Sequence, residues 1–322
     1  MNHLRHFFDG QLEIETTYGA IVKRLVKLII LVASAGIFAW ILLRRLESST
    51  AGQGVPHHNQ QENASISHAG YFGFSGNLYA MIGLPAAAQK LAPAIPASLL
   101  NAMHEPGIHQ VDLVTPDGQR FLFISLLPFK TKREASLRGY HMGRWPDESE
   151  KGTSLPEGFI EVTPENQTMP LSKSFRLRDF LPHDQAEVWP KFIVLRMSLL
   201  DKLELLAQEL DQRKLPSRLH IMSGFRTPQY NSREVGRGRA GNSRHIYGDG
   251  ADVFVDHDRN NLMDDLNGDG ETTLDDAHFL LALADNIEKY YPELAGGLSA
   301  YPATAAHGPF LHIDVRGVRV RW

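Results

Sequence analysis

The sequence predicts an α+β fold, with an antiparallel sheet domain preceded by a membrane-spanning helix and a small strand-rich module. Residues 188–210 carry apolar side chains at the spacing of an amphipathic helix. Short strand patterns bounded by Gly and Pro follow this helix. A long uncharged apolar run lies near the amino terminus. At 322 residues the chain is long enough for two folded regions and a tail.

Composition narrows the classes of partner and cofactor. The net charge of -4 argues against a nucleic-acid-binding protein. The chain contains no cysteine, so it has neither disulfides nor thiolate metal sites. Any bound metal must therefore be held by His and carboxylate side chains.

The apolar run at 28–43 predicts a single membrane-spanning helix. It lies between Lys27 and Arg44 and extends to about twenty residues, enough to cross a hydrocarbon layer of roughly 30 Å. We expect a cytoplasmic segment at 1–24 and an uncleaved anchor at 25–46. A cleaved signal peptide is the alternative, disfavoured because Arg44 and Arg45 follow the run at once. A buried core helix is a further alternative.

Three regions follow the anchor. Residues 47–69 are polar and without periodicity, which is typical of a flexible linker. Residues 70–172 form the strand-rich module, because the alternation at 111–129 on both sides of Pro116-Asp117-Gly118 predicts a hairpin. The role of this module is not readable from the sequence. Residues 173–322 form the carboxyl-terminal domain.

Potential metal ligands gather in two strand-like segments of that domain, at 243–252 and 307–314. Side chains alternate between the faces of a strand, so Asp252 lies opposite Val253, and His312 and Asp314 share a face. Two neighbouring strands would present these groups to a common space, and His245 would join them from the preceding Gly-rich turn. Taken alone, a His with an Asp seven residues later is equally compatible with a structural role.

Two imidazoles and one carboxylate suit Zn²⁺, whose catalytic sites keep a fourth position for water. The metal lowers the pKa of such a water towards about 7 and polarises a scissile carbonyl. The set His245, Asp252 and His312 therefore predicts a hydrolytic zinc site.

The motifs Ser-x-His-x-x-Gly with an Asp seven residues after the His, a later His-x-Asp, and an upstream Ser-Gly-Phe-Arg occur together between residues 175 and 322. In these motifs the chain resembles the zinc D-alanyl-D-alanine carboxypeptidase and murein endopeptidase family, which has the hedgehog/DD-peptidase fold. The resemblance implies that His245, Asp252 and His312 are the zinc ligands. It also implies that Arg226 binds the substrate carbonyl and stabilises its developing negative charge.

His307 matches the histidine that, in one branch of the family, acts on the bound water. Other branches use a Glu three residues before the last ligand, where this chain has Pro309. His307 is therefore the candidate base, since a neutral imidazole can take and return a proton near pH 7. Ser243 and Asp314 are candidates for orienting the ligand histidines by hydrogen bonding, or are ordinary polar residues.

The insertion at 256–276 contains a second ion-binding pattern. The carboxylate, amide and hydroxyl side chains have the spacing of an EF-hand loop with Gly270 at its sixth position, and Asp stands where the last position usually has Glu. We predict a structural Ca²⁺ held by Asp265, Asn267, Asp269, Glu271, Thr273 and Asp276. A solvated acidic loop without an ion is the alternative.

These features together predict a zinc peptidase that acts on peptidoglycan stem peptides from the periplasmic side of a bacterial cytoplasmic membrane. The residues after the last ligand, which include Arg319, Arg321 and Trp322, resemble the murein endopeptidase branch. A D-alanyl-D-alanine carboxypeptidase is the alternative within the class. A non-catalytic wall-binding or scaffold protein that retains zinc is the alternative outside it.

Overall fold

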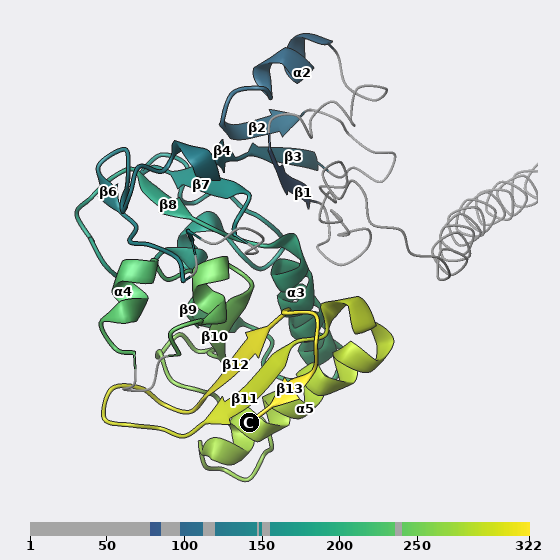
Figure 1. Ribbon diagram of the computed structural model, residues 1–322. Helices are drawn as coiled ribbons and strands as arrows, with labels where there is room; N and C mark the ends of the chain where they lie inside the picture. The colour runs from purple at the N-terminus through teal and green to yellow at the C-terminus, as the bar shows by residue number, and fades with distance from the viewer. Residues whose placement is uncertain (1–77, 85–96, 112–119, 147, 150–154, 236–239) are drawn as a thin grey trace, which may run out of the picture. The chain divides into compact units, whose positions relative to one another are not determined.

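The structure is a computed structural model that describes residues 78–84, 97–111, 120–146, 148–149, 155–235 and 240–322 (Figure 1). These residues form a mixed α+β fold with several small sheets, as the sequence predicts. No helix among them has the length and hydropathy needed to cross a membrane. The predicted anchor at 25–46 and its flanks at 1–24 and 47–69 lie outside the described residues.

The first sheet has three strands in the order β1-β3-β2. Strands β2 (Gly107–Val111) and β3 (Arg120–Ser125) pair antiparallel, as the predicted hairpin requires, and its expected turn at 116–118 lies outside the described residues. Strand β1 (Leu78–Gly83) pairs parallel with β3, and a short helix, α2 (Ala97–Ala102), lies between β1 and β2 in the sequence.

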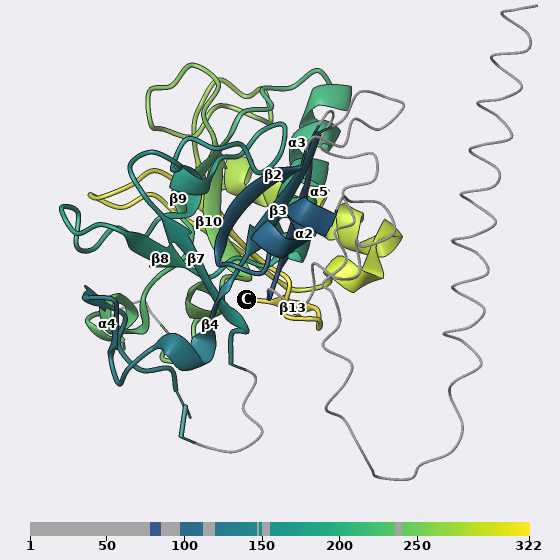
Figure 2. The ribbon, with the colours of Figure 1, turned by 90° about the horizontal axis from the view of Figure 1, so that it is seen from above.

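The second sheet has the order β4-β7-β8 and crosses the boundary expected at residue 172. Its strands are β4 (Leu127–Pro128), β7 (Gly158–Val162) and β8 (Lys191–Ile193), and Figure 2 shows β7 beside β8. The described residues all belong to one compact unit. The strand-rich module and the carboxyl-terminal domain are therefore not separate compact units, because β7 from one pairs with β8 from the other.

Short elements fill the chain around this sheet. A hairpin of β5 (Ser136–Leu137) and β6 (Tyr140–His141) follows the 3-10 turn η2 (Phe129–Thr131). A second such turn, η3 (Leu177–Phe180), precedes β8.

Helix α3 (Met197–Gln212) begins nine residues later than the start at 188 that the periodicity predicts. Pro190 explains part of the difference, because a proline disfavours helix at the residue before it and lacks an N–H. Phe192 and Ile193 explain the rest, since both are fully buried in β8, where Ile193 pairs with Ile160 of β7. Tertiary pairing therefore replaces the first turns of the expected helix with a strand.

The third sheet has the order β13-β11-β12-β10-β9 and supports the candidate site. Strands β9 (Leu219–Ser223), β10 (Gly250–Val255) and β12 (Phe310–Asp314) confirm the predicted strands, and β10 pairs antiparallel with both β9 and β12. The remaining strands are β11 (Gly297–Tyr301), antiparallel to β12, and β13 (Val320–Arg321), parallel to β11.

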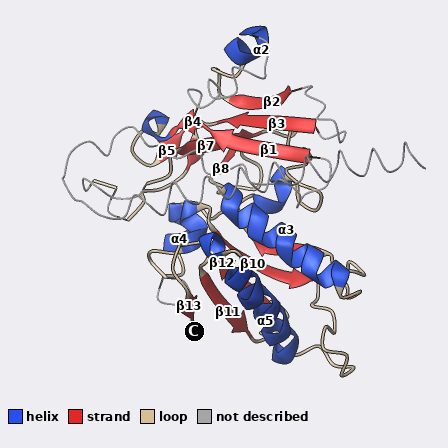
Figure 3. Cartoon of the chain, turned by 90° about the vertical axis from the view of Figure 1, so that its right-hand side faces the viewer, coloured by secondary structure: helices blue, strands red, loops and turns tan. Residues whose placement is uncertain are grey.

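Helix α5 (Leu274–Tyr290) follows the insertion and begins with Thr273 as its N-cap. It contacts β11 and β12, and α3 lies beside it (Figure 3). Val253, Leu311 and Ile313 are fully buried in the core beneath these helices. Because strand side chains alternate, the neighbouring Asp252 and His312 face the opposite side of the sheet. Two short elements complete the domain: α4 (Pro228–Ser232) after β9, and η5 (Pro292–Leu294) after α5.

Candidate metal centre

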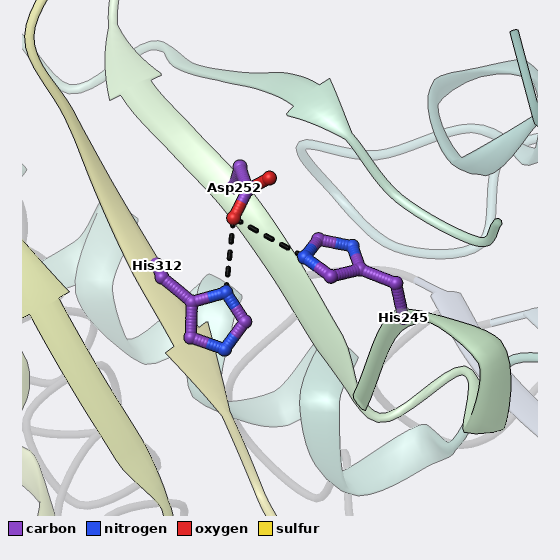
Figure 4. Close-up of side chains that lie close together, drawn as sticks. All are labelled: His245, Asp252 and His312. Carbon is purple, nitrogen blue, oxygen red and sulfur yellow. Dashed lines mark hydrogen bonds and ion pairs between the residues drawn. The ribbon is translucent and has the colours of Figure 1, made fainter. Parts of the chain in front are cut away.

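Three predicted ligands converge on the face of the sheet that the helices leave open (Figure 4). Asp252 of β10 and His312 of β12 are register partners, so their side chains lie side by side. His245 reaches Asp252 from η4 (Arg244–Tyr247), the turn before β10. Asp252 Oδ1 lies 3.2 Å from His245 Nε2 and 2.9 Å from His312 Nδ1. Among the residues that the structure describes, no other group of His and carboxylate atoms lies so close together.

A glycine-dependent turn positions His245. Gly248 ends η4 with φ of 65°, and a Cβ atom there would lie 2.2 Å from the carbonyl oxygen of Val194. Only glycine fits this backbone conformation and this close approach. The indole Nε1 of Trp145 donates a buried 2.9 Å hydrogen bond to the carbonyl of Ile246 in the same turn. No sequence pattern indicates this last contact, because it joins residues 101 positions apart.

Each ligand histidine has its second ring nitrogen held by the protein. His245 Nδ1 lies 2.8 Å from the carbonyl oxygen of Gly224, and because a carbonyl can only accept, Nδ1 carries the proton. His312 Nε2 lies 3.1 Å from Asp314 Oδ2. The other nitrogen of each ring, Nε2 of His245 and Nδ1 of His312, therefore faces Asp252 and is the atom available to a metal. Metal-binding histidines in proteins are oriented in this way.

The predicted orienting residues differ in what they contact. Asp314 is fully buried, and besides His312 it accepts hydrogen bonds from the backbone N–H of Gly297 at 2.7 Å and from the Arg316 guanidinium. Ser243 is buried at the start of η4, but within the described residues its hydroxyl has no hydrogen bond to either ligand histidine. Asp314 thus contacts a ligand and Ser243 does not. The Trp322 ring packs against His312 with 5.4 Å between ring centroids.

Burial and mutual attraction set the charges of the group. Burial lowers the pKa of His245. Burial opposes ionisation of Asp252, yet His245, His312 and Arg226 hold the pKa of its carboxyl well below the usual range. Burial also opposes protonation of His312, but its contacts with Asp252 and Asp314 raise its pKa above that of a free histidine. Two ionised carboxylates therefore surround imidazoles in a buried space, which favours a cation there.

The donor set fits a zinc ion. Two nitrogen atoms and one oxygen atom converge, no sulfur ligand is needed, and one coordination position is left for water. Other divalent transition metals accept the same ligand types, so the donor set alone does not identify zinc.

Arg226 lies at the edge of the group, in the loop between β9 and α4. Its Nη2 forms an ion pair with Asp252 Oδ2, the carboxylate oxygen that the histidines do not use, and its Nε donates a 2.8 Å hydrogen bond to Ser223. The guanidinium is largely buried and sits against a ligand carboxylate. Its predicted contact with a substrate carbonyl stays a prediction.

His307 lines a hollow beside the metal group, which we call the histidine hollow. This hollow has a volume of about 230 Å³, and its main lining residues are His183, His220, Met222, Phe254, Met263 and His307. His307 Nδ1 lies 2.8 Å from the carbonyl oxygen of Gly308, so Nδ1 carries the proton of the neutral ring and Nε2 remains an acceptor. A ring held in this tautomer can take a proton from a water molecule. Nothing in the sequence singled out His183 or His220, which are isolated histidines outside any motif.

The predicted calcium loop has its oxygen atoms occupied by the loop's own backbone. Asp265 accepts the N–H groups of Gly268 and Gly270, at 2.7 and 2.8 Å. Asp276 is fully buried and accepts the N–H groups of Leu266 at 2.7 Å and Thr273 at 2.8 Å, the second as part of the cap of α5. The carboxylates of this loop do not form a compact ligand group of the kind found at His245. Calcium binding stays a prediction.

Comparison with known proteins adds no assignment. No family model, no curated protein and no solved structure matches the chain. The resemblance to zinc wall peptidases therefore rests on the sequence motifs alone.

Proposed function

We propose that this protein is a zinc-dependent peptidase of the hedgehog/DD-peptidase type that hydrolyses amide bonds in bacterial peptidoglycan peptides, as a murein endopeptidase. The observation that carries the proposal is the buried group of His245, Asp252 and His312, in which each imidazole offers one oriented lone pair to a common point. The histidine hollow beside this group supplies room for substrate.

The side chains divide the chemistry among them. A zinc ion held by the three ligands would supply Lewis acidity and would lower the pKa of a bound water. His307 is the general base of the proposal, with Nε2 as the atom that takes a proton and returns it to the leaving amine. Arg226 contributes a fixed positive charge at the edge of the group, where it attracts the carbonyl oxygen as negative charge develops. Asp314 holds the His312 ring so that Nδ1 faces the metal position.

The setting follows from the sequence. The predicted anchor at 25–46 holds the domain on the periplasmic side of the cytoplasmic membrane, where wall stem peptides are available. The Ca²⁺ predicted at 256–276 is structural in this proposal. Peptidoglycan and the membrane are the partners, and nucleic acid is not.

Digestion of purified sacculi by the zinc-loaded full chain, with mass analysis of the products, tests the proposal. Split cross-bridges are expected for an endopeptidase. Release of free D-alanine alone would assign the carboxypeptidase activity instead. Absence of any product, with one zinc bound, would exclude both activities and leave the non-catalytic wall-binding or scaffold role.

The His307→Ala variant tests the mechanism separately. We expect hydrolysis to fall by about 10² to 10⁴-fold, the usual contribution of a general base. Zinc content should stay near that of the wild type, because His307 is not among the converging ligands. His278→Ala, which changes an exposed histidine of α5, is the matched control. If His307→Ala and His278→Ala lose the same amount of hydrolytic activity, His307 is not the general base.

A further inference from the structure

The histidine hollow contains groups that the proposed hydrolysis does not use. Of its three histidines, only His307 has a role in proton transfer, and none of the metal ligands lines it. Its other residues come from β9, β10 and the chain after β10. The lining groups that the hydrolysis does not use therefore indicate that the hollow binds a ligand group of its own.

The hollow lies one step along the sheet from the metal group, on the same face. Phe254 follows Asp252 by two residues on β10, so the two side chains point to the same side. His220 is the register partner of Phe254, and their rings lie 4.7 Å apart. Two strand residues span about 7 Å. A substrate side chain next to the cleaved bond can therefore reach the hollow.

The floor of the hollow suits a short aliphatic chain. Phe254 and Met263 are buried, and Met222 lies beside them at the bulge where the β9 pairing shifts register. A volume of about 230 Å³ is smaller than the pockets of ~300 Å³ and more that hold drug-sized ligands. The hollow thus has room for one side chain, with methylene groups against an apolar surface.

The polar groups that line the hollow include hydrogen-bond acceptors. Among the described residues, no Lys, Arg, Asp or Glu lines it. His183 Nε2 lies 2.9 Å from the carbonyl oxygen of Met222 and so carries the proton, which leaves Nδ1 as an acceptor. His307 Nε2 is the proton acceptor of the proposed hydrolysis, so His183 is the acceptor that remains for a bound side chain. Burial lowers the pKa of His220, which disfavours a positive charge on this ring.

The surroundings add negative charge. Asn261 and Met263, which line the hollow, belong to a segment that also carries Asp256, Asp258 and Asp264. Arg218 pairs with Asp256 at 3.1 Å, and Arg259 offsets one further charge, so the segment remains acidic on balance. A carboxylate in the hollow would lack a cationic partner. An ammonium group would meet the acceptor nitrogen of His183 and the Phe254 ring.

We propose that the histidine hollow binds the aliphatic amine side chain of a substrate residue next to the cleaved bond, with His183 as a specificity residue. The substrate class is thereby peptides that carry a free side-chain amino group. The proposal rests on the proposed peptidase function for its cleavage measurements, but the hollow itself can be tested by binding alone.

Cleavage of purified muropeptide dimers, before and after acetylation of their free amino groups, provides the first test. The wild type is expected to cleave the free-amine form at least about tenfold better in kcat/KM, the scale of a hydrogen bond to a charged group. His183→Phe keeps a ring but removes its acceptor nitrogen, and should lose most of this preference. His278→Phe is the matched control and should keep it.

Binding provides a second test that needs no turnover. The full chain, labelled with ¹⁵N at histidine, is titrated with Nα-acetyl-lysine methylamide and with its Nε-acetylated form. The free amine should shift the ring signals of His183, and the acetylated form should not.

The outcomes separate the two proposals. Equal cleavage of both dimers, or equal binding of both probes, overturns the amine site while leaving the peptidase intact. Selective binding without cleavage of any dimer would retain the amine site and remove the peptidase function.

Discussion

The metal group and the acidic loop both adjoin strand β10, yet they satisfy their oxygen atoms in different ways. Asp252 lies within β10, and its Oδ1 is approached only by two imidazole nitrogens from distant parts of the chain. Asp265 lies in the loop beyond the end of β10 and Asp276 lies in the first turn of α5, and the oxygens of both accept N–H groups from that loop. The buried group brings side chains from distant segments to one point that a metal ion can occupy, whereas the loop satisfies its carboxylates with its own N–H groups and holds its shape without an ion.

Removal of a ligand histidine is expected to have the largest effect. His245→Ala or His312→Ala leaves two protein ligands, so zinc affinity should fall by on the order of 10³-fold or more, and hydrolysis with it. Zinc content after dialysis against a weak chelator measures the loss. His278→Ala should retain zinc. Full zinc retention in both ligand variants would mean that the metal does not bind at this group.

Two substitutions in the acidic loop distinguish a structural role of its carboxylates from a calcium-binding role. Asp276→Ala removes a buried carboxylate that accepts several N–H groups, so it should reduce the free energy of unfolding by about 1 to 3 kcal/mol with or without Ca²⁺. Asp269→Ala, on the exposed side, should change stability only when Ca²⁺ is present.

Thermal unfolding with Ca²⁺ and with chelator measures both variants. If Ca²⁺ does not stabilise the wild type, the loop is a solvated acidic loop. If it does, and Asp269→Ala abolishes the gain, the loop is a calcium site.

Substitution of Asp314 tests how strongly zinc affinity depends on residues that contact the ligands. Asp314→Asn keeps the shape but weakens the hold on His312 Nε2, so we expect zinc affinity to fall by about 10 to 100-fold. Competition with a chromogenic chelator measures the affinity. The Ser243→Ala variant is the matched comparison and should bind zinc normally, because its hydroxyl does not contact a ligand histidine within the described residues. An equal loss from both would contradict the role given to Asp314.

The dependence on pH should have opposite signs with and without metal. The pKa of His312 is raised in the folded protein, so after chelation its contribution to stability is complete below about pH 6.5 and is lost as pH rises through the raised value. Zinc must displace that proton, so its affinity should increase over the same range. Chemical unfolding of the chelated protein and zinc titration at several pH values measure the two trends. Parallel trends would contradict the assignment of His312 as a ligand.

Local patterns predicted most elements near the site. The alternation around Asp252 and His312 predicted strands with polar groups on one face, and β10 and β12 have this arrangement because the opposite face is buried beneath helices. The helix start at 188 was wrong, because the pairing of Ile193 with a distant strand outweighs local periodicity. The boundary at 172 missed the same pairing.

The sequence by itself determined the ligand types, the spacing of the motifs and the order of the strands around them. Only the tertiary structure decided that His245, Asp252 and His312 meet at one point, and that Gly224 and Asp314 orient the two rings. It also decided that the carboxylates of the acidic loop are not part of the metal group and that His183 and His307 line one hollow. The physical reason is that patterns along the chain record which face a side chain occupies, whereas distances between segments depend on how sheets and helices pack.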